Sequence, residues 1–259
     1  MTASPPHPSG WLFRPAAERF HSRLDWLDSW HSFSFASHFD PAWRGFGPLL
    51  VINDDTIAAG QGFGPHPHRD MEIITVMVEG QLNHEDSIGH RAVLRAGEVQ
   101  RMSAGTGIVH SEINGGEGAC RLLQVWIEPD CRGLPPTYAQ KPFPQSPGWT
   151  LLLDPVGSSG ALTIHRQARV WRGSVPANAT LPVPSPPGQG GWIQMISGAI
   201  QLRGAAGLAG PAGVPAMGEG TLALAQGDGL GFGGAAGGPS PLSVTAGSLG
   251  ADLLWLALF

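Results

Sequence analysis

The stretch "GFGPHPHRDMEII", residues 62–74, places His66 and His68 one residue apart, directly before an apolar run. Successive side chains of a β-strand point to opposite faces, so two histidines at positions i and i+2 project from the same face. On one face they can share a metal ion. A His-x-His pair by itself is common on surfaces and in turns, so its interpretation depends on what else the chain supplies.

A second pair with the same spacing lies in "GTGIVHSEIN", residues 105–114, where His110 and Glu112 also project together from a strand. On facing strands of a small barrel, three imidazoles and one carboxylate surround one position and leave room for water or substrate, as in catalytic metal sites. All four groups stand beside apolar runs, where an unpaired buried carboxylate costs on the order of several kcal/mol. A bound ion removes that cost. The sequence therefore predicts a metal site formed by His66, His68, His110 and Glu112.

The composition is typical of a compact, turn-rich globular protein. The 259 residues are 42% hydrophobic and 14% charged, and they include 38 glycines and 24 prolines. This length suits roughly one to two domains. The net charge is −5 and Lys141 is the only lysine, which argues against direct binding of nucleic acid.

Neither end of the chain nor its interior carries a membrane or export signal. The N-terminal segment "MTASPPHPSG" lacks the basic and apolar parts of a signal peptide, and no apolar run reaches the roughly 20 residues of a membrane span. We therefore expect a cytoplasmic protein that does not enter the membrane. In that reducing compartment, Cys120 and Cys131 are expected to be free thiols.

Short strands at close intervals dominate the expected secondary structure. Runs that alternate in polarity or are rich in β-branched residues lie between glycines and prolines, and a helical period is missing apart from a turn or two around residues 16–30. This pattern favours an all-β sandwich or barrel. The strand candidates are residues 48–53, 72–78, 121–128, 162–166, 192–202 and 253–259.

The composition changes near the middle of the chain. Before Phe143 the chain carries most of its histidines and acidic residues, whereas from Ser146 onward glycine, alanine and proline dominate. The proline-containing residues 137–148 are interpreted as the linker between two domains. Residues 204–220 and 227–239 are nearly all small, and we expect them to form long surface loops.

The residues around the two histidine pairs resemble the motifs of the cupins, small β-barrels that hold a metal ion inside. The first cupin motif is matched, with one extra residue before the last glycine, by Gly60, His66, His68, Glu72 and Gly80. The second motif is matched by Gly97, Gly105, His110 and Asn114. Together the matches imply a cupin barrel in the first half of the chain.

Longer segments resemble the pirin family, whose members are bicupins with a metal ion in the N-terminal barrel. In the first half these segments are "WLDSWHSFSFASHFDP", "GFGPLLVINDD", "GFGPHPHRDMEIIT", "GEVQRMSAGTGIVHSE" and "LLQVWIEPDCRGLPPTYAQK". In the second half, "IHRQARVWRGSV", "WIQMISGAIQL" and "LAQGDGLGF" resemble the second pirin cupin, which ordinarily keeps the barrel and lacks the ligands. The resemblance implies an all-β chain of two cupin barrels (double-stranded β-helix or jelly-roll), with a metal-binding domain over residues 1–143 and a degenerate cupin domain over residues 144–259.

The residues alone leave the fourth ligand open. Glu72 lies an even number of positions after His68, so it could also face inward. In pirins the ligating acid stands two residues after the histidine of the second motif. The resemblance therefore implies Glu112 as the ligand and leaves Glu72 as a neighbouring structural group.

The other histidines are interpreted as structural or surface residues. His84 and His90 flank a turn-like segment and are expected to be exposed. His31 and His38 lie in a segment rich in Trp and Phe, where a hydrogen-bonded structural role is the default. His165 has no second histidine beside it, so it is expected to be a packed or surface residue rather than a ligand.

Three imidazoles and a carboxylate suit Fe(II), Mn(II), Co(II), Ni(II) or Zn(II), and we expect Fe(II), the commonest choice for oxygen chemistry. Pirins of the bacterial type that this chain resembles are associated with quercetin 2,3-dioxygenase activity, in which a flavonol is cleaved with O2 and carbon monoxide is lost. The resemblance implies a dioxygenase with a flavonol-like substrate, in which Glu112 acts as general base.

Two other functions use the same motifs. Pirins also resemble a metal-dependent, redox-responsive regulator that docks on a protein partner without turnover, and the same ligands serve that role. A sugar-phosphate isomerase of the cupin type would need cationic groups around the pocket, for which Arg101 is the nearest candidate in the sequence.

Overall fold

The computed structural model of the protein describes residues 11–184, 189–204, 221–233 and 242–258. Within these ranges the regular structure consists of β-strands and three short 3₁₀ helices, η1 (Ala16–Glu18), η2 (Pro41–Trp43) and η3 (Ser158–Gly160). The all-β expectation is confirmed. The expected helical turns around residues 16–30 are reduced to η1, because most of the remaining segment forms strands β2 (Phe20–Arg23) and β3 (Leu27–His31).

The chain divides into two compact units. The first unit comprises Arg19–Pro144 and Pro155–Gln167, and the second comprises residues 11–18, Gln145–Asp154 and the described residues from Ala168 onward. Each unit contains its own sheets and its own core, as expected for a chain of two barrels.

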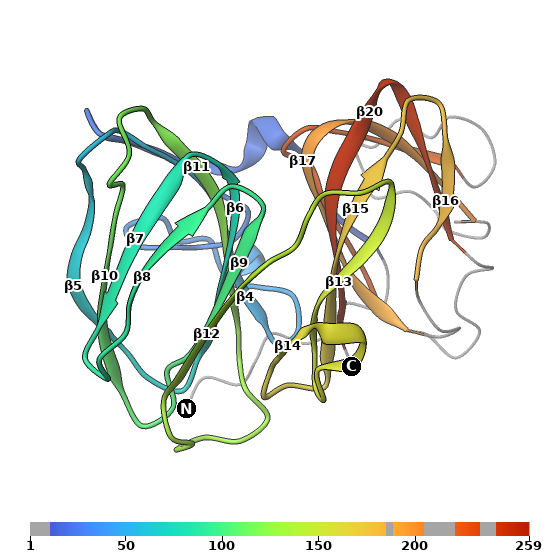
Figure 1. Ribbon diagram of the computed structural model, residues 1–259. Helices are drawn as coiled ribbons and strands as arrows, with labels where there is room; N and C mark the ends of the chain where they lie inside the picture. Colours follow the sequence, from blue (N-terminus) through green and yellow to red (C-terminus); the bar gives the residue numbers. More distant parts are fainter. Residues whose placement is uncertain (1–10, 185–188, 205–220, 234–241, 259) are drawn as a thin grey trace. The chain divides into compact units, whose positions relative to one another are not determined.

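Two antiparallel sheets build the first unit (Figure 1). The larger sheet has the strand order β12-β9-β6-β11-β4-β3-β2. Its strands are β2 (Phe20–Arg23), β3 (Leu27–His31), β4 (Leu49–Ile57), β6 (Glu72–Glu79), β9 (Glu98–Ser103), β11 (Cys120–Ile127) and β12 (Thr137–Pro142). The smaller sheet has the order β5-β10-β7-β8 and consists of β5 (Gly62–His68), β7 (Gln81–Asp86), β8 (Arg91–Arg95) and β10 (Ile108–Ile113). A short strand, β14 (Leu162–Thr163), also lies in this unit.

The interior of the first unit contains a polar row between two apolar clusters. One cluster contains Ile57, Met77, Leu82, Leu94 and Leu122, and the other contains Ile73, Met102, Ala104 and Ile108. Along β6, Ile73 belongs to the second cluster and Met77 to the first. Thr75 lies between them on the same face, in register with Gln100 of β9 and Gln124 of β11. This row of three buried polar side chains needs hydrogen-bond partners inside the barrel.

The second unit is built around two long antiparallel strands, β17 (Gly190–Arg203) and β20 (Ser243–Leu258). Strands β19 and β1 extend the sheet on the β17 side, and β15 and β13 extend it on the β20 side. Their bounds are β1 (Trp11–Arg14), β13 (Gly148–Asp154), β15 (Ala168–Val175) and β19 (Gly229–Phe232). Strand β16 (Thr180–Pro182) pairs with β20, and β18 (Thr221–Ala225) pairs with β17. The core includes Trp255, whose ring stacks on Phe232 with 5.2 Å between centroids.

Five of the six predicted strands appear with shifted ends, and the sixth, residues 162–166, is reduced to β14. Residue 259, at the end of the last candidate, lies outside the described residues. The interpretation of residues 137–148 as a linker is wrong for its first half, because Thr137–Pro142 forms β12 and pairs with β9. Strand β12 is the edge of its sheet, and Pro142 is its last residue, a position where a missing N–H is tolerated.

The loop expectation for residues 227–239 is also partly wrong. Within it, β19 contributes the buried side chains of Leu230 and Phe232 to the core of the second unit. Residues 205–220 and 234–241 lie outside the described residues. Two buried large side chains in a short segment are enough to make it a strand, although small residues surround them.

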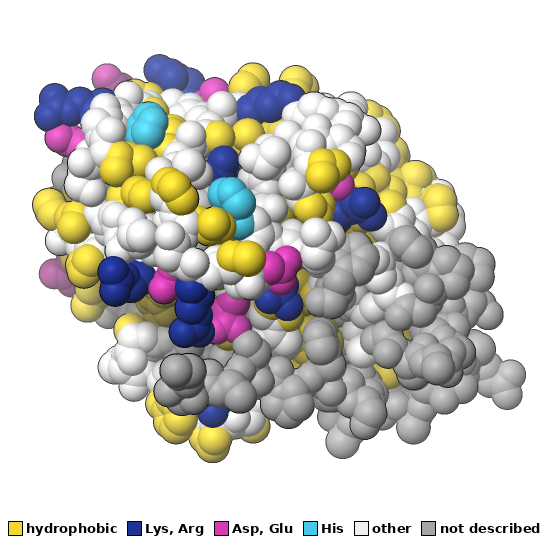
Figure 2. Space-filling model, turned by 90° about the horizontal axis from the view of Figure 1, so that it is seen from below, with side chains coloured by type: hydrophobic (Ala, Val, Ile, Leu, Met, Phe, Trp, Pro, Cys, Tyr) yellow, Lys and Arg dark blue, Asp and Glu magenta, His cyan; other side chains and the backbone are white. Residues whose placement is uncertain are grey.

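The predicted free thiols are confirmed, because Cys120 is buried and Cys131 is exposed and neither forms a disulfide. Within the described ranges, no helix is long and apolar enough to cross a membrane. The location of the protein in the cell stays a prediction. On the surface shown in Figure 2, Lys and Arg side chains are interspersed with acidic and hydrophobic ones.

Candidate metal centre

Strand β10 is the centre of the candidate site because it lies between β5 and β7 in the smaller sheet. His110 of β10 is in register with His66 of β5 on one side and with Asp86 of β7 on the other. Glu112 is in register with His84 of β7. The register of β10 with β5 shifts between His110 and Glu112, which marks a β-bulge at the site.

The structure brings the three predicted imidazoles together. The ring centroids of His66 and His110 are 4.4 Å apart, those of His66 and His68 are 4.8 Å apart, and those of His68 and His110 are 4.9 Å apart. Each ring offers a nitrogen, and these nitrogens lie within 4.8 Å of one another. His110 is buried, whereas His66 and His68 are partly exposed, so the group is reachable from outside the barrel.

The nitrogens of this group have few protein partners. The Nδ1 of His66 contacts the carbonyl oxygen of Gly64 at 2.8 Å, which leaves its Nε2 free to act as a ligand. The Nε2 of His68 and both ring nitrogens of His110 are buried without a hydrogen-bond partner among the described residues. Burying such groups unpaired is costly, and a metal ion would satisfy one nitrogen of each ring.

The surroundings of His68 and His110 keep these two imidazoles neutral. The pKa of His68 is lowered to about 4 and that of His110 to about 3, mainly by burial and in addition by the neighbouring histidines. Glu112 acts in the opposite direction on His68, and Asp86 does so on His110. Imidazole binds metal ions in its neutral form, so the protein presents these rings in the state that ligation needs.

Glu112 is buried and held by the polar row of the larger sheet. Its Oε2 accepts a hydrogen bond from Gln124 at 2.7 Å. Its Oε1 accepts from Gln100 at 3.1 Å and from Thr75 at 3.3 Å. The three donors face Glu112 from the opposite sheet, so this carboxylate is what satisfies the polar row inside the barrel.

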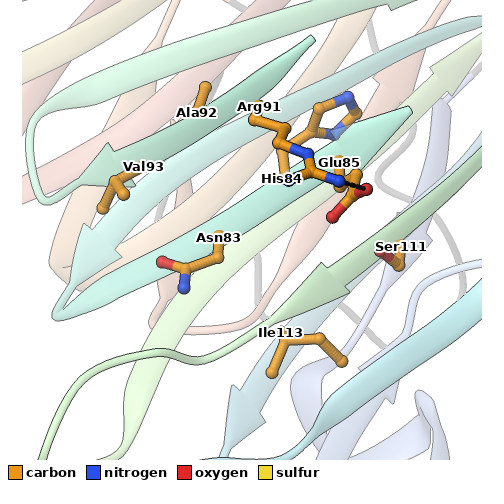
Figure 3. Close-up of a pocket in the computed structure, with 8 residues that line it drawn as sticks. All are labelled: Asn83, His84, Glu85, Arg91, Ala92, Val93, Ser111 and Ile113. Carbon is orange, nitrogen blue, oxygen red and sulfur yellow. Dashed lines mark hydrogen bonds and ion pairs between the residues drawn. The ribbon is translucent and has the colours of Figure 1, made fainter. Parts of the chain in front are cut away.

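Glu112 does not join the three-imidazole group. Instead, its ligand atom lies within 4.8 Å of those of His110 and His84, so the structure contains two groups that share His110. His84 is 2% exposed, and its predicted position on the surface is therefore wrong. Glu85, the next residue of β7, is exposed and pairs with Arg91 at 2.6 Å on the outer face (Figure 3). The alternation in "NHEDS" is the signal that could have placed His84 inside.

Comparison with known proteins identifies the family to which these features belong. Residues 13–127 match the Pirin family model, and residues 151–236 match the model of the quercetinase C-terminal cupin domain. Quercetin 2,3-dioxygenase of Escherichia coli (strain K12) is 44% identical over 192 residues, which cover 74% of this chain and 83% of that protein. The chain belongs to the pirin family.

Solved structures of pirins agree with this assignment. The bacterial pirin YhhW from Escherichia coli, in a structure with nickel(II), superposes with a TM-score of 0.83 at 36% identity and covers 96% of this chain and 98% of that one. The Pirin-like protein of Caulobacter vibrioides is 39% identical over 183 residues, which cover 69% of this chain and 79% of that protein. The two-cupin fold expected for a pirin is thus confirmed.

Glu72, the other acid of the first motif, lies on the face of β6 opposite to Thr75 and points away from the three imidazoles. Its Oε2 accepts a hydrogen bond from Ser103 at 2.8 Å, and its Oε1 lies 3.3 Å from Nδ1 of His165. The even spacing from His68 does not place Glu72 on the face of the imidazoles. The chain turns at Asp70, which has a positive φ of 48°, and then enters a different sheet.

The remaining candidates have structural contacts. His31 is buried and bonds to Asn53 at 2.8 Å and to Ser22 at 2.9 Å, as expected for a structural histidine. Arg101 is buried and donates to Ser103 at 3.0 Å and to Thr137 at 2.5 Å. Its side chain is therefore engaged by these oxygens, so Arg101 is not available as the cationic group that a sugar-phosphate isomerase would need.

Proposed function

We propose that this pirin is a metal-dependent dioxygenase of the quercetin 2,3-dioxygenase type, which cleaves a flavonol with O2 and releases carbon monoxide. The observation that carries the proposal is the convergence of three imidazoles beside a hydrogen-bonded carboxylate, where His68 and His110 have buried nitrogens without a partner among the described residues. The name of the relative from Escherichia coli supports the same activity.

The proposed ligands are His66, His68, His110 and Glu112, and together they would hold one divalent transition ion. The three imidazoles form one group of potential ligands, and Glu112 is linked to it through His110, which belongs to both groups. Imidazole and carboxylate donors suit Fe(II), which we propose for the oxygen chemistry, and equally Ni(II), the ion in the structure of the pirin YhhW. When bound, the ion would supply a Lewis acid for the flavonol hydroxyl and a centre for chemistry with O2.

The side chains of the site have separate proposed tasks. Glu112 takes the proton of the flavonol 3-hydroxyl at a carboxylate oxygen, and the amides of Gln100 and Gln124 keep that carboxylate in one orientation. His66 and His68 are partly exposed, so the substrate is proposed to enter from their side rather than from the side of buried His110. The edge of Trp126 contacts His68, with 4.9 Å between ring centroids, and fixes that ring.

We also propose that residues 1–143 form the metal-binding domain and residues 144–259 the degenerate one. Among the described residues, both groups of potential metal ligands lie in the first unit. The second unit contains Asp154, Asp228 and Asp252, and each of them pairs with an arginine or a backbone N–H. Such acids are engaged in structure and do not converge on one point.

The test is aerobic turnover of quercetin. The metal-free protein is reconstituted separately with Fe(II), Mn(II), Co(II), Ni(II) and Zn(II), and the near-visible absorbance of quercetin is followed together with the release of carbon monoxide. We expect absorbance decay and carbon monoxide with at least one ion, and none with the metal-free protein. Failure with all five ions would overturn the proposal and favour a metal-binding regulator that acts on a protein partner.

A further inference from the structure

His84 occupies a position beside the candidate ligands that no motif assigns to the site. It lies on β7 directly opposite Glu112 of β10, and its ring centroid is 5.3 Å from that of His110. One ligand atom each from His84, His110 and Glu112 lie within 4.8 Å of one another, and all three side chains are buried. A buried imidazole this close to a carboxylate and a second imidazole has the surroundings of a ligand.

The hydrogen bonds of His84 leave one nitrogen available to this group. Its Nε2 lies 3.2 Å from Oδ2 of Asp86, so the carboxylate accepts the ring N–H there. Asp86 is itself fixed by the backbone N–H groups of Ile88 at 3.0 Å and His90 at 2.9 Å. The Nδ1 of His84 therefore carries the lone pair, and in the described part of the chain it is buried without a partner.

His84 shares this pattern with His66, in which one nitrogen is bonded to a protein oxygen and the other stays unpartnered. Histidines that ligate metal ions almost always donate their second ring N–H to a carboxylate or a backbone carbonyl. Both arrangements occur here, a carbonyl at His66 and a carboxylate at His84. The ring of His84 is also held in place by Tyr138, which stacks on it with 4.5 Å between centroids.

We infer that His84 is a further metal ligand, and that His84, His110 and Glu112 form a second position for the divalent transition ion next to the three-imidazole group. The inference rests on the metal centre proposed above and adds one ligand and one ion position to it. His110 belongs to both groups, so one ion occupies one position at a time. The second position includes the carboxylate, whose negative charge stabilises a divalent cation more than neutral imidazoles do.

The test removes the first group and asks whether an ion still binds. In the double variant His66→Ala, His68→Ala, the three-imidazole group is lost while His84, His110 and Glu112 remain. We expect this variant to bind one Ni(II) per chain, at least about tenfold more weakly than the wild type. Adding His84→Gln should abolish that binding, because glutamine can still donate to Asp86 but lacks the Nδ1 ligand.

His90→Gln is the matched control in the same double variant. His90 also bonds to Asp86, at 3.1 Å, and also stacks on Tyr138, yet it lies outside both ligand groups. We expect His90→Gln to leave the residual Ni(II) binding unchanged. A folded double variant that binds no Ni(II), or one whose binding survives His84→Gln, would overturn the inference; circular dichroism establishes folding.

A second measurement uses the otherwise wild-type chain, so that it does not depend on the double variant. The visible absorption of bound Co(II) reports the ligands, and it should change with His84→Gln but not with His90→Gln. An unchanged spectrum in both variants would overturn the role of His84. If only this inference fails, the wild type still binds metal and turns over quercetin. If the proposed function fails, the wild type does not turn over quercetin, so the two failures are distinguishable.

Discussion

The amide Nε2 of Gln124 donates a 2.7 Å hydrogen bond to Oε2 of Glu112, and this bond joins the two sheets of the first unit at the polar row. Glu112 comes from the smaller sheet and Gln124 from the larger one. The orientation of the carboxylate is thus set by the sheet opposite to the strand that carries it. The hydrogen-bond donors around Glu112 are therefore as important for the geometry of the candidate site as the position of Glu112 in the motif.

Gln124→Leu should weaken metal binding. The substitution removes the shortest hydrogen bond to Glu112, so the carboxylate loses its fixed orientation, and we expect the Kd for Ni(II) to rise by about 10- to 100-fold. The free energy of unfolding should fall by about 1–3 kcal/mol, because a buried acceptor loses its donor. Calorimetric titration and urea unfolding measure the two effects.

Gln194→Leu is the control for that change. Gln194 is buried in the second unit, and it accepts a hydrogen bond from Trp192 much as Gln124 accepts one from Trp126. We expect Gln194→Leu to lower stability without changing the affinity for Ni(II). Equal weakening of metal binding by both variants would mean that Gln124 acts only through general stability.

Glu112→Gln should separate turnover from substrate binding. A glutamine keeps the size of the side chain but cannot take a proton from the flavonol hydroxyl. We expect kcat to fall by about 100-fold or more while the Kd for quercetin changes far less. Steady-state kinetics and fluorescence titration provide the two values. Equal losses in both would count against the role of Glu112 as general base.

His110→Leu should abolish the stabilisation that metal gives and leave the metal-free protein at least as stable as the wild type. Both nitrogens of His110 are buried without partners among the described residues, so an apolar side chain removes an unpaired polar group. At Ni(II) concentrations of 100 times Kd, the wild type should gain about 2.7 kcal/mol and the variant nothing. Thermal unfolding with and without Ni(II) shows the difference; a variant that still gains stability would contradict the role of His110.

Glu72→Gln should leave metal binding intact. Glu72 bonds to Ser103 and His165 on the outer face of β6, so its carboxylate is structural. We expect one metal ion per chain, as in the wild type, and a free energy of unfolding lower by about 1 kcal/mol. Elemental analysis of the purified variant gives the stoichiometry. Loss of the ion would return Glu72 to the set of ligands.

Asp55→Asn should change how stability depends on pH. Asp55 is buried inside the first unit, and its pKa is raised to about 7. Burial is the largest cause, the charges of Asp54 and Glu112 contribute to the increase, and the hydrogen bond from Ser29 opposes it. A raised pKa in the folded state means that the carboxyl keeps its proton there while the unfolded chain releases it. The contribution of Asp55 to stability is therefore present below its unfolded pKa of about 3.8 and is lost as the pH rises to about 7.

The comparison of the wild type with Asp55→Asn isolates this effect, because the titrations of all other groups are nearly common to both chains. Relative to the variant, the wild type should lose up to about 4 kcal/mol of stability between pH 4 and pH 8. Urea unfolding at several pH values measures the difference. A difference in stability that does not vary with pH would show that Asp55 titrates normally.

The spacing of residues along single strands determined much of this protein. His-x-His and His-x-Glu place their side chains on one face of β5 and β10 because strand alternation is a local property, and no tertiary contact is needed to read it. The glycines and prolines between the strands indicated where most strands lie, because their preference for turns is also a local property. The resemblance to pirins supplied the two-barrel arrangement, which the family comparison then confirmed.

Only the tertiary structure decided which face of each strand meets the barrel interior. Glu72 follows the histidines in even register and yet points outward, because the turn at Asp70 moves the chain into the other sheet. His84 stands next to exposed residues in the sequence and yet faces Glu112, because β7 pairs with β10. Alternation fixes relative positions within a strand, but pairing between distant strands fixes what those side chains meet, and that depends on the whole fold.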